Sequence, residues 1–220
     1  MTPILYPESG HIPLYPTGED LADRSVPPFR VWVPERTILV IGYSQVAEAE
    51  LNSDAIREDG IPVYKRKGGG GAVLLSPNCV CVGLRFRRHA AQGITDFFAA
   101  SNGFISRTLH EGFNVDLAPR GISDLASDDR KVLGSSMHLS RDCALYFASI
   151  LVDVSPTLLD HYLRHPSREP DYREGRTHDA FVRNLIDIPD LDKITPFSLR
   201  EVLEKKVSDR DTVPDLDWLD

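Results

Sequence analysis

The pattern of apolar and polar positions predicts strands along most of the chain. Residues 29–33 alternate apolar and polar side chains, a pattern typical of a strand with one buried face. Residues 37–42 form a continuous apolar run, which predicts a strand buried on both faces. Similar short runs predict further strands at 61–64, 79–86, 113–117, 131–137 and 143–152.

Helices are predicted in four segments. Residues 46–59 are rich in Ala, Glu and Leu and precede Gly60, a common residue type at a helix end. Residues 94–111 place aromatic and aliphatic side chains near helical spacing, and helices are also expected at 156–163 and 196–207. Strands in consecutive groups mixed with helices favour an α+β fold over a doubly wound sheet. We therefore predict mixed or antiparallel sheets flanked by helices.

The length of 220 residues suffices for one domain with a closed core. Residues 1–30 are rich in Pro and Gly and predict an irregular leader, and residues 118–130 predict a loop. Residues 208–220 are acidic and predict a loose tail. Because neither an internal repeat nor an interior linker is recognisable, we expect residues 1–220 to form a single domain.

Composition narrows the class of protein. A net charge of -8 argues against a general nucleic-acid binder, which needs a basic face. Three cysteines do not make a disulfide framework and fit a reducing compartment. No apolar run approaches the roughly 18 residues of a membrane span, and the N-terminus lacks the features of a secretory signal. We therefore expect a cytoplasmic protein with neither nucleic acid nor membrane as a partner.

A run of four glycines, Gly68, Gly69, Gly70 and Gly71, follows the basic triplet 65–67. Glycine allows positive φ and close approach of the backbone to a ligand, and adjacent cations can neutralise a phosphate or carboxylate. The alternative is a flexible turn between two strands, although a hairpin needs only two such residues. The run matches neither a Walker A loop nor a dinucleotide-binding fingerprint, because the spacing of both motifs is missing.

Two charged residues further along the chain are candidates for chemistry. Lys131 stands at the start of a predicted strand, where a lysine is usually a solvated charge. A lysine there could also bind an acyl carbonyl and a phosphate together, with Gly134 leaving room for a ligand chain. Asp124 is either a turn-capping carboxylate or a ligand-binding one. Gln45 follows a buried strand, at the kind of position where sheets present ligand-binding loops.

The cysteines and histidines give weaker signals. Cys143 lies near Arg141 and could be a nucleophile, although it opens an apolar run and is more typical of a buried residue. Cys79 and Cys81 point to one face of a strand, but no second pair completes a zinc site. The seven histidines form no metal-binding pattern, so we predict no metal ligands among the side chains.

Read in order, these segments resemble the catalytic domain of the lipoate–protein ligase A family. The segment 42–45 with Asn52 is similar to its G-R-x-Q…N element, and residues 63–73 are similar to its R-R-x-x-G-G-G-A-V loop. Residues 123–125 look like its N-D-[LI] element, and residues 130–136 look like its K-[IV]-[SA]-G-[ST]-A element. The resemblance covers roughly residues 30–207 and implies the biotin/lipoate protein ligase fold.

The resemblance also implies a reaction. ATP and Mg²⁺ would convert lipoate or octanoate to an acyl-adenylate, and the acyl group would pass to a lysine of a lipoyl domain or an H-protein-like acceptor. Lys131 would contact the acyl carbonyl and the phosphate, and Asp124 would help to hold the nucleotide and metal. The resemblance places the remaining substrate-binding and nucleotide-binding residues at Gln45, Arg66, Gly68, Gly69, Gly70, Gly71, Ala72, Val73, Gly134, Ser135 and Ser149.

Several positions depart from the family pattern. Leu75 and Ser76 stand where the family often has His and Asp, and residues 146–150 replace its H-H-G-T-L strand. The usual N-terminal helix motif is not recognisable in residues 1–30. The chain also stops where the small C-terminal accessory domain of the family would begin. We therefore expect that a separate accessory protein could be needed for adenylate formation.

Three alternatives stay open. Related octanoyltransferases use a cysteine nucleophile without ATP, and that cysteine would fall near 163–166 or within 113–124, where this chain has none. Biotin–protein ligases carry a different basic loop, G-R-G-R-x-G-R. A non-catalytic relative that only binds lipoylated domains is the third alternative, and replacement of Lys131 by alanine would separate such a binder from an enzyme.

Overall fold

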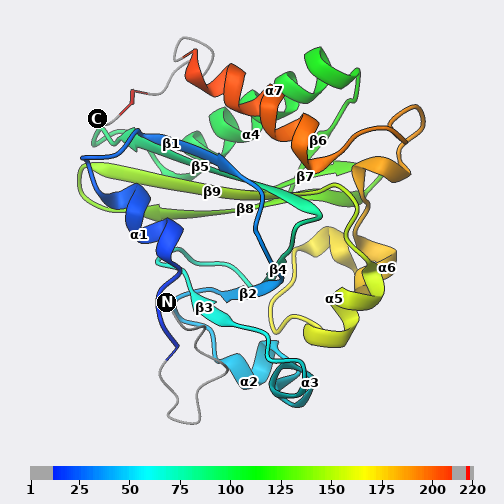
Figure 1. Cartoon of the computed structure of the whole chain (residues 1–220). Helices are drawn as coiled ribbons and strands as arrows, with labels where there is room; N and C mark the ends of the chain where they lie inside the picture. The colour runs from blue at the N-terminus through cyan, green and yellow to red at the C-terminus, as the bar shows by residue number, and fades with distance from the viewer. Residues whose placement is uncertain (1–11, 210–216, 219–220) are drawn as a thin grey trace.

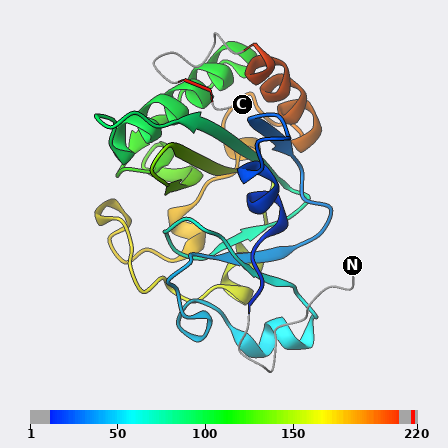
Figure 2. The ribbon, with the colours of Figure 1, turned by 90° about the vertical axis from the view of Figure 1, so that its left-hand side faces the viewer.

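A computed structural model describes residues 12–209 and 217–218 of the chain. A six-stranded antiparallel sheet and a three-stranded sheet are stacked, and two helices cover the far side of the larger sheet (Figure 1). Figure 2 shows the same layers from the side, with the smaller sheet below the larger one. The α+β class and the flanked sheets that the apolar pattern predicts are confirmed. None of the helices in the described part has the length and apolarity to cross a membrane.

The larger sheet has the strand order β1-β5-β9-β8-β7-β6, and each neighbouring pair is antiparallel. Its central strands β5, β9 and β8 are long, whereas the edge strands are short. The bounds are β1 Phe29–Trp32, β5 Cys79–Arg87, β6 Ala118–Arg120, β7 Asp124–Ser127, β8 Arg130–Leu139 and β9 Cys143–Leu151.

Strand β5 shows how the sequence builds both faces of this sheet. Its even-numbered residues, from Val80 to Phe86, join the core formed with the helices α4 (Ile94–Phe113) and α7 (Pro196–Ser208). Its odd-numbered residues Cys79 and Cys81 join a second core on the opposite face. Alternation of side chains along a strand thus makes β5 part of two cores, which explains why eight of its nine residues are buried.

The smaller sheet has the order β3-β2-β4, with bounds β2 Ile38–Ile41, β3 Val63–Lys65 and β4 Val73–Leu75. Strand β2 is parallel to β3 and antiparallel to β4. Every residue of β2 is buried, as its continuous apolar run predicts. The basic and glycine residues 66–72 connect β3 to β4, so this loop begins and ends on neighbours of the same central strand.

The helix predicted over 46–59 is two short helices, α2 Ala47–Glu50 and α3 Ser53–Glu58. Leu51 and Asn52 separate them, because Leu51 forms a bridge with Leu163 and the Asn52 amide donates to the Tyr162 carbonyl. This tertiary pairing outweighs local helix propensity. The helices predicted at 156–163 and 196–207 are confirmed as α5 Pro156–Tyr162 and α7. Three further short helices are η1 Asp171–Arg173, α6 His178–Phe181 and η2 Leu185–Asp187.

Other expectations need correction. The strand expected at 113–117 is absent from that described segment, because α4 runs to Phe113 and Asn114 ends it with a left-handed φ of 55°. The predicted loop 118–130 contains β6 and β7, whose short polar sequences hide their sheet pairing.

The terminal segments also differ from the expectation. The leader includes a helix, α1 Pro16–Ala22, which buries Leu21. The acidic tail contains a packed residue, since the Trp218 ring lies 4.9 Å from that of Phe86. Residues 1–11, 210–216 and 219–220 lie outside the described part.

Candidate functional site

A cavity of about 760 Å³ lies where the two sheets face each other, within the usual range for ligand sites. Its apolar lining comes from β2, β4, β5, β9 and the segment 159–182. Its polar lining comes from the β3–β4 loop, β7, β8 and the same segment 159–182, with one residue each from α2 and β9. The cavity can therefore hold a molecule with an apolar chain at one part and an anionic group at another. The polar residues at its wall are Glu50, Arg66, Lys67, Ser123, Asp124, Lys131, Ser135, Ser136, Ser149, Arg164, Arg168, Asp171, Tyr172, Arg173 and His178.

A β-bulge turns Lys131 toward this cavity. Leu125 of β7 pairs with Leu133, whereas the next residue, Ala126, pairs with Lys131, so β8 carries one extra residue at Val132. A bulge re-aims the side chains beside it. Lys131 consequently lies on the same face as Gly134, which strict alternation would forbid, and both residues line the cavity.

Lys131 forms an ion pair with Asp124 at the cavity wall. The distance from Lys131 Nζ to Asp124 Oδ1 is 2.9 Å, and the side chains are 28% and 5% exposed. The Tyr172 hydroxyl donates to Asp124 Oδ2 at 2.9 Å, and the Ser123 hydroxyl donates to Oδ1 at 3.2 Å. Burial raises the pKa of Tyr172, and the neighbouring Asp124 carboxylate raises it further, so the phenol stays a donor. Asp124 is therefore held from three sides and positions the ammonium group.

Gly134 serves a different purpose from the one expected. A Cβ at this position would lie 2.5 Å from Lys131 Cε and 2.6 Å from Lys131 Nζ. The space beside Gly134 is thus filled by the lysine of the same strand, whereas the sequence predicted room for a ligand chain. Glycine at position 134 lets the Lys131 side chain lie against the backbone of its own strand.

The glycine loop is organised around Arg66. The Arg66 guanidinium donates to the carbonyl oxygens of Val40, Gly69 and Gly71 at 3.2, 2.9 and 2.6 Å. Burial lowers the pKa of Arg66 to about 10, so the group stays charged at neutral pH. Arg66 lines the cavity, but its donors point to backbone oxygens. Arg66 therefore stabilises the loop. Its positive charge can attract an anionic ligand in the cavity, but its hydrogen bonds are used by the loop.

Two close backbone contacts fix the position of the loop. A Cβ on Gly42 would lie 2.2 Å from the Gly70 carbonyl oxygen, and one on Gly68 would lie 2.9 Å from the Met137 carbonyl oxygen. The Tyr43 amide also donates to the Gly68 carbonyl at 3.1 Å. Gly70 has a φ of 92°, in the region that favours glycine. The loop is thus packed against β2 and β8, unlike a flexible turn.

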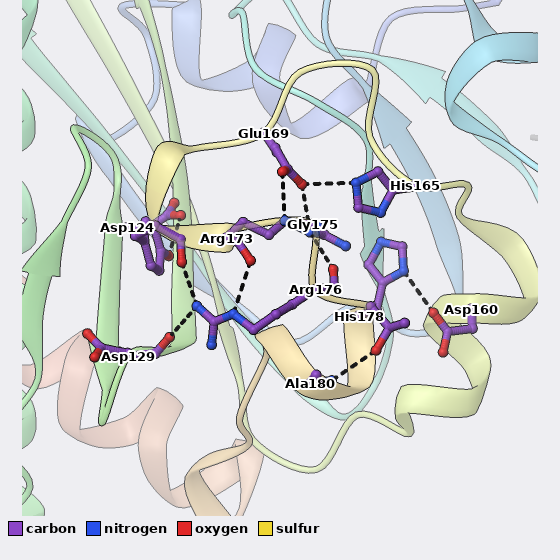
Figure 3. A network of polar contacts seen from close by, with 12 residues as sticks. Asp124, Asp129, Asp160, His165, Glu169, Arg173, Gly175, Arg176, His178 and Ala180 are labelled. Atoms are coloured by element: carbon purple, nitrogen blue, oxygen red, sulfur yellow. Dashed lines mark hydrogen bonds and ion pairs between the residues drawn. The ribbon is translucent and has the colours of Figure 1, made fainter.

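The segment between α5 and α6 closes the cavity on a third side (Figure 3). Glu169 accepts from the Gly175 amide at 2.9 Å and pairs with His165 at 2.9 Å. Arg176 donates to the Tyr172 and Asp129 carbonyls at 2.5 and 3.2 Å, which joins this segment to the β7–β8 turn. Figure 3 shows His165, Glu169, Gly175 and Arg176 on one stretch of chain, with Asp124 on the neighbouring strand β7 and Asp129 in the β7–β8 turn.

Sequence reasoning did not find the cavity residues of this segment. Arg173 is 4% exposed, and its Nη2 has no hydrogen-bond partner among the described residues. His178 pairs through Nδ1 with Asp160 at 2.8 Å. The buried carboxylate Glu50 accepts a short hydrogen bond from the Ser167 hydroxyl. The arginines and histidines of this polar stretch were the available signal, but charge runs of this kind usually form a solvated face.

The structure brings most of the predicted site residues to one cavity. Gly68, Gly69 and Gln45 are all described and lie outside its lining, although the Gln45 side-chain amide reaches the Gly70 carbonyl at 3.5 Å. Their contribution is to the shape of the loop. The predicted residues that line the cavity are Arg66, Gly70, Gly71, Ala72, Val73, Asp124, Lys131, Gly134, Ser135 and Ser149.

The cysteines are poorly placed to act as nucleophiles, and Cys79 is fully buried and lies outside the cavity lining. Cys143 is partly buried and does not contribute to the cavity lining, and burial raises the pKa of its thiol. Cys81 lines the cavity, but burial holds the pKa of its thiol well above the ordinary value. Both thiols are therefore protonated at neutral pH, and the nucleophilic form of cysteine is the thiolate.

No cluster of three or more His, Cys, Asp or Glu side chains that could hold a metal ion is present within residues 12–209 and 217–218. Mg²⁺ is commonly held by one or two carboxylates together with the phosphates of a nucleotide. Asp124 is a buried carboxylate at the polar part of the cavity. It fits a metal that arrives with a nucleotide better than a resident ion.

Comparison with known proteins agrees with this architecture. The family described as "Lipoyl protein ligase A/B catalytic domain" matches residues 19–208. Lipoate–protein ligase 1 of Plasmodium falciparum is 31% identical over 133 residues, which is 60% of this chain and 31% of the relative. Lipoate–protein ligase A subunit 1 of Thermoplasma acidophilum is 24% identical over 174 residues, 75% of this chain and 66% of the relative. The chain thus spans between about a third and two thirds of these relatives.

Solved structures show the same fold. A lipoate–protein ligase A bound with ATP matches with a TM-score of 0.74 at 20% sequence identity. The match covers 96% of this chain and 87% of that structure's chain. The Plasmodium falciparum enzyme in complex with lipoate matches with a TM-score of 0.67 at 26% sequence identity. That match covers 85% of this chain and 51% of the chain of the Plasmodium falciparum enzyme. The stacked sheets, the cavity between them and the match over residues 19–208 together place this chain in the lipoyl protein ligase A/B catalytic domain family.

Proposed function

We propose that this chain is a lipoate–protein ligase, which activates lipoate or octanoate with ATP and transfers the acyl group to a lysine of an acceptor protein. The observation that carries the proposal is the convergence of the glycine loop and the Lys131–Asp124 pair on one cavity with a large apolar part. Such a cavity suits an acyl chain joined to a nucleotide phosphate.

Lys131 supplies the charge that the chemistry needs. Attack of a nucleophile on the acyl carbonyl develops negative charge on the carbonyl oxygen and on the departing phosphate. The Lys131 ammonium lies at the polar part of the cavity, and its pairing with Asp124 at 2.9 Å holds it in a fixed position. A pre-positioned cation of this kind stabilises the transition state without reorganisation.

The nucleotide end would lie against the glycine loop and the α5–α6 segment. Gly70 and Gly71 allow the backbone to approach a phosphate closely. Arg173 lines the same cavity, and its Nη2, which has no hydrogen-bond partner within residues 12–209 and 217–218, is a candidate donor to a phosphate oxygen. Asp124 would hold a Mg²⁺ ion that enters with ATP, and that ion would neutralise phosphate charge during adenylate formation.

Relatives support the class of partners. The structures of the family include one with ATP bound and one with lipoate bound. The Thermoplasma acidophilum system is described as a bi-partite lipoate–protein ligase with its E2 lipoyl domain. We accordingly propose a lipoyl domain or an H-protein-like domain as the acceptor, and a separate accessory protein as the partner for adenylate formation.

The test is an acylation assay read by mass spectrometry. The chain, ATP, Mg²⁺ and lipoate are incubated with an apo lipoyl domain, and the mass gain of one lipoyl group is expected. A parallel sample receives synthetic lipoyl-adenylate without ATP, so that a need for an accessory protein is recognised. Absence of a mass gain from both samples, with octanoate as well as lipoate, would contradict the proposal.

A transferase that uses cysteine is the competing activity within this family. Cysteine replacement separates the two, because acylation by a ligase should survive Cys143→Ser and Cys81→Ser but should require ATP or the adenylate. Acylation from an acyl carrier that is independent of ATP and lost in Cys143→Ser or Cys81→Ser would favour the transferase. Binding of the lipoyl domain without any acylation would favour the non-catalytic relative.

A further inference from the structure

The acceptor lysine has to lose a proton before it can attack. A lysine side chain has an ordinary pKa of about 10.4 and is almost entirely protonated at neutral pH, so its nitrogen has no free electron pair. Lys131 is itself a cation paired with Asp124, and it cannot take up a further proton. A group beside the cavity with a free lone pair would assist the attack by accepting this proton.

His178 is placed for this task. It is the first residue of α6, and its side chain lines the same cavity as Lys131. The end of α6 lies directly beside β8, because Val182 forms a parallel bridge with Lys131 and the Arg183 amide donates to the Lys131 carbonyl at 2.8 Å. The Val182 amide in turn donates to the His178 carbonyl at 2.9 Å. His178 therefore lies one helical turn before Val182, the residue that bridges to Lys131.

The pairing of His178 with Asp160 fixes which nitrogen can accept a proton. His178 Nδ1 lies 2.8 Å from Asp160 Oδ1, and a carboxylate can only accept, so Nδ1 carries the hydrogen. Nε2 then keeps its lone pair. It has no hydrogen-bond partner in the part of the chain that the structure describes. Figure 3 shows the imidazole directed at Asp160 of α5, which sets the orientation of the ring.

The groups around the ring favour its neutral form. Burial is the largest influence and lowers the pKa of His178, and the side chain is 12% exposed. Asp160 acts in the opposite direction, whereas Arg173 of η1 and His165 of the α5–α6 segment lower the pKa further. A neutral imidazole at neutral pH has the protonation state that a general base requires.

We infer that His178, held by Asp160, is the proton acceptor for the acceptor lysine, an assignment that rests on the proposed acyl transfer. The lysine proton moves to His178 Nε2. The freed nitrogen pair forms the C–N bond to the acyl carbonyl carbon, and the bond from that carbon to the phosphate oxygen breaks. The second proton of the attacking nitrogen passes to the phosphate oxygen of the departing AMP, which leaves with the bond electrons, and the imidazolium later returns its proton to solvent.

The experiment measures single-turnover transfer from synthetic lipoyl-adenylate to an apo lipoyl domain in wild type and in His178→Asn. Asparagine keeps a donor toward Asp160 but offers no basic nitrogen. Lysine acylation should fall about 100-fold, as is typical when a general base is removed. Reaction of the same enzyme-bound adenylate with hydroxylamine, which is largely unprotonated at neutral pH, should stay within about twofold of wild type.

The control is a matched His–Asp pair outside the cavity. His110 Nδ1 lies 2.8 Å from Asp116 Oδ1, but these side chains are 56% and 89% exposed. His110→Asn should transfer at the wild-type rate.

Asp160→Asn should slow lysine acylation about tenfold, because Asp160 orients the imidazole ring of His178. The rate of the reaction with hydroxylamine should stay unchanged in this variant.

The pH profile gives a second readout. The wild-type rate should rise with pH until His178 loses its proton and should then level off, at a pH below the ordinary imidazole value. His178→Asn should lack this inflection. Equal losses with lysine and hydroxylamine, or a normal rate with lysine, would overturn the role of His178. Failure of wild type to transfer from the adenylate to either nucleophile would instead overturn the proposed function.

Discussion

The two walls of the cavity each carry a buried or half-buried cation, and the two cations do opposite things. Arg66 in the glycine loop directs its donors to the carbonyls of Val40, Gly69 and Gly71, so its charge stabilises the backbone. Lys131 on β8 forms an ion pair with Asp124 and lines the cavity. A basic residue at a ligand site is therefore part of either the framework or the chemistry, and its hydrogen-bond partners distinguish the two cases.

The largest effect that this comparison predicts is the loss of activity in Lys131→Ala. Acyl transfer should fall by about 1000-fold, in the range seen when a charge-stabilising donor is removed. The midpoint of thermal unfolding should barely change, because Lys131 is partly exposed and Asp124 keeps its Tyr172 and Ser123 donors. Single-turnover kinetics and calorimetry measure the two quantities. The control is Lys205→Ala, an exposed lysine on α7.

Arg66→Ala should give the converse result, with stability as the primary loss. Its removal leaves three carbonyl oxygens without their buried donor, which should lower the free energy of unfolding by about 3 kcal/mol. Urea denaturation measures this change. Arg66→Lys should recover only a small part, since an ammonium cannot reproduce the planar fork. An unaltered unfolding midpoint together with a large loss of ligand affinity would show that Arg66 is a ligand-binding residue after all.

Gly134→Ala should produce a smaller loss, confined to activity. The added methyl group would lie 2.5 Å from Lys131 Cε, so the lysine side chain must move. Transfer should fall about tenfold, because displacement of a catalytic group by an ångström is costly. Stability should change by less than about 1 kcal/mol, since the flexible lysine can yield. A drop in activity as large as that of Lys131→Ala would mean that the ammonium has been removed from the site entirely.

The smallest effects distinguish neighbouring glycines of the loop. Gly70→Ala should destabilise by about 1 kcal/mol, because Gly70 has a φ of 92° and its new Cβ would lie 2.8 Å from Arg66 Nη2. A Cβ on Gly69 would meet none of the described residues within 4 Å, so Gly69→Ala should change the unfolding free energy by less than about 0.5 kcal/mol. Equal destabilisation by both variants would mean that chain entropy outweighs the contacts of Arg66.

The apolar pattern carries the fold prediction where burial is simple. The strands β2, β5 and β9 appear as predicted, because burial on two faces leaves a clear trace in composition. Strand β8 also appears where it was predicted, although most of its residues are only partly buried. Strands β6 and β7 were missed, since they are three and four residues long and are held by tertiary pairing, β7 with β8 and β6 with β7. The break between α2 and α3 was missed because it depends on Leu163, more than a hundred residues away.

The site divides in the same way. Lys131, Asp124 and the glycine loop could be found from spacing, since their residue types stand together in short motifs. The direction of Lys131 could not, because it depends on the bulge at Val132, where the pairing of β7 with β8 slips by one residue. Tyr172, Arg173 and His178 were missed because they contact the cavity only after the α5–α6 segment has folded over it.

The carbonyls that Arg66 holds have a consequence for recognition. Four consecutive glycines would ordinarily be costly to bind, because an unrestrained chain must lose its freedom when a ligand arrives. Here that loss is incurred during folding, when Gly42, Met137 and the guanidinium lock the loop. A nucleotide should therefore bind to a preformed site. Its binding kinetics should show one fast phase, without a slow conformational change afterwards.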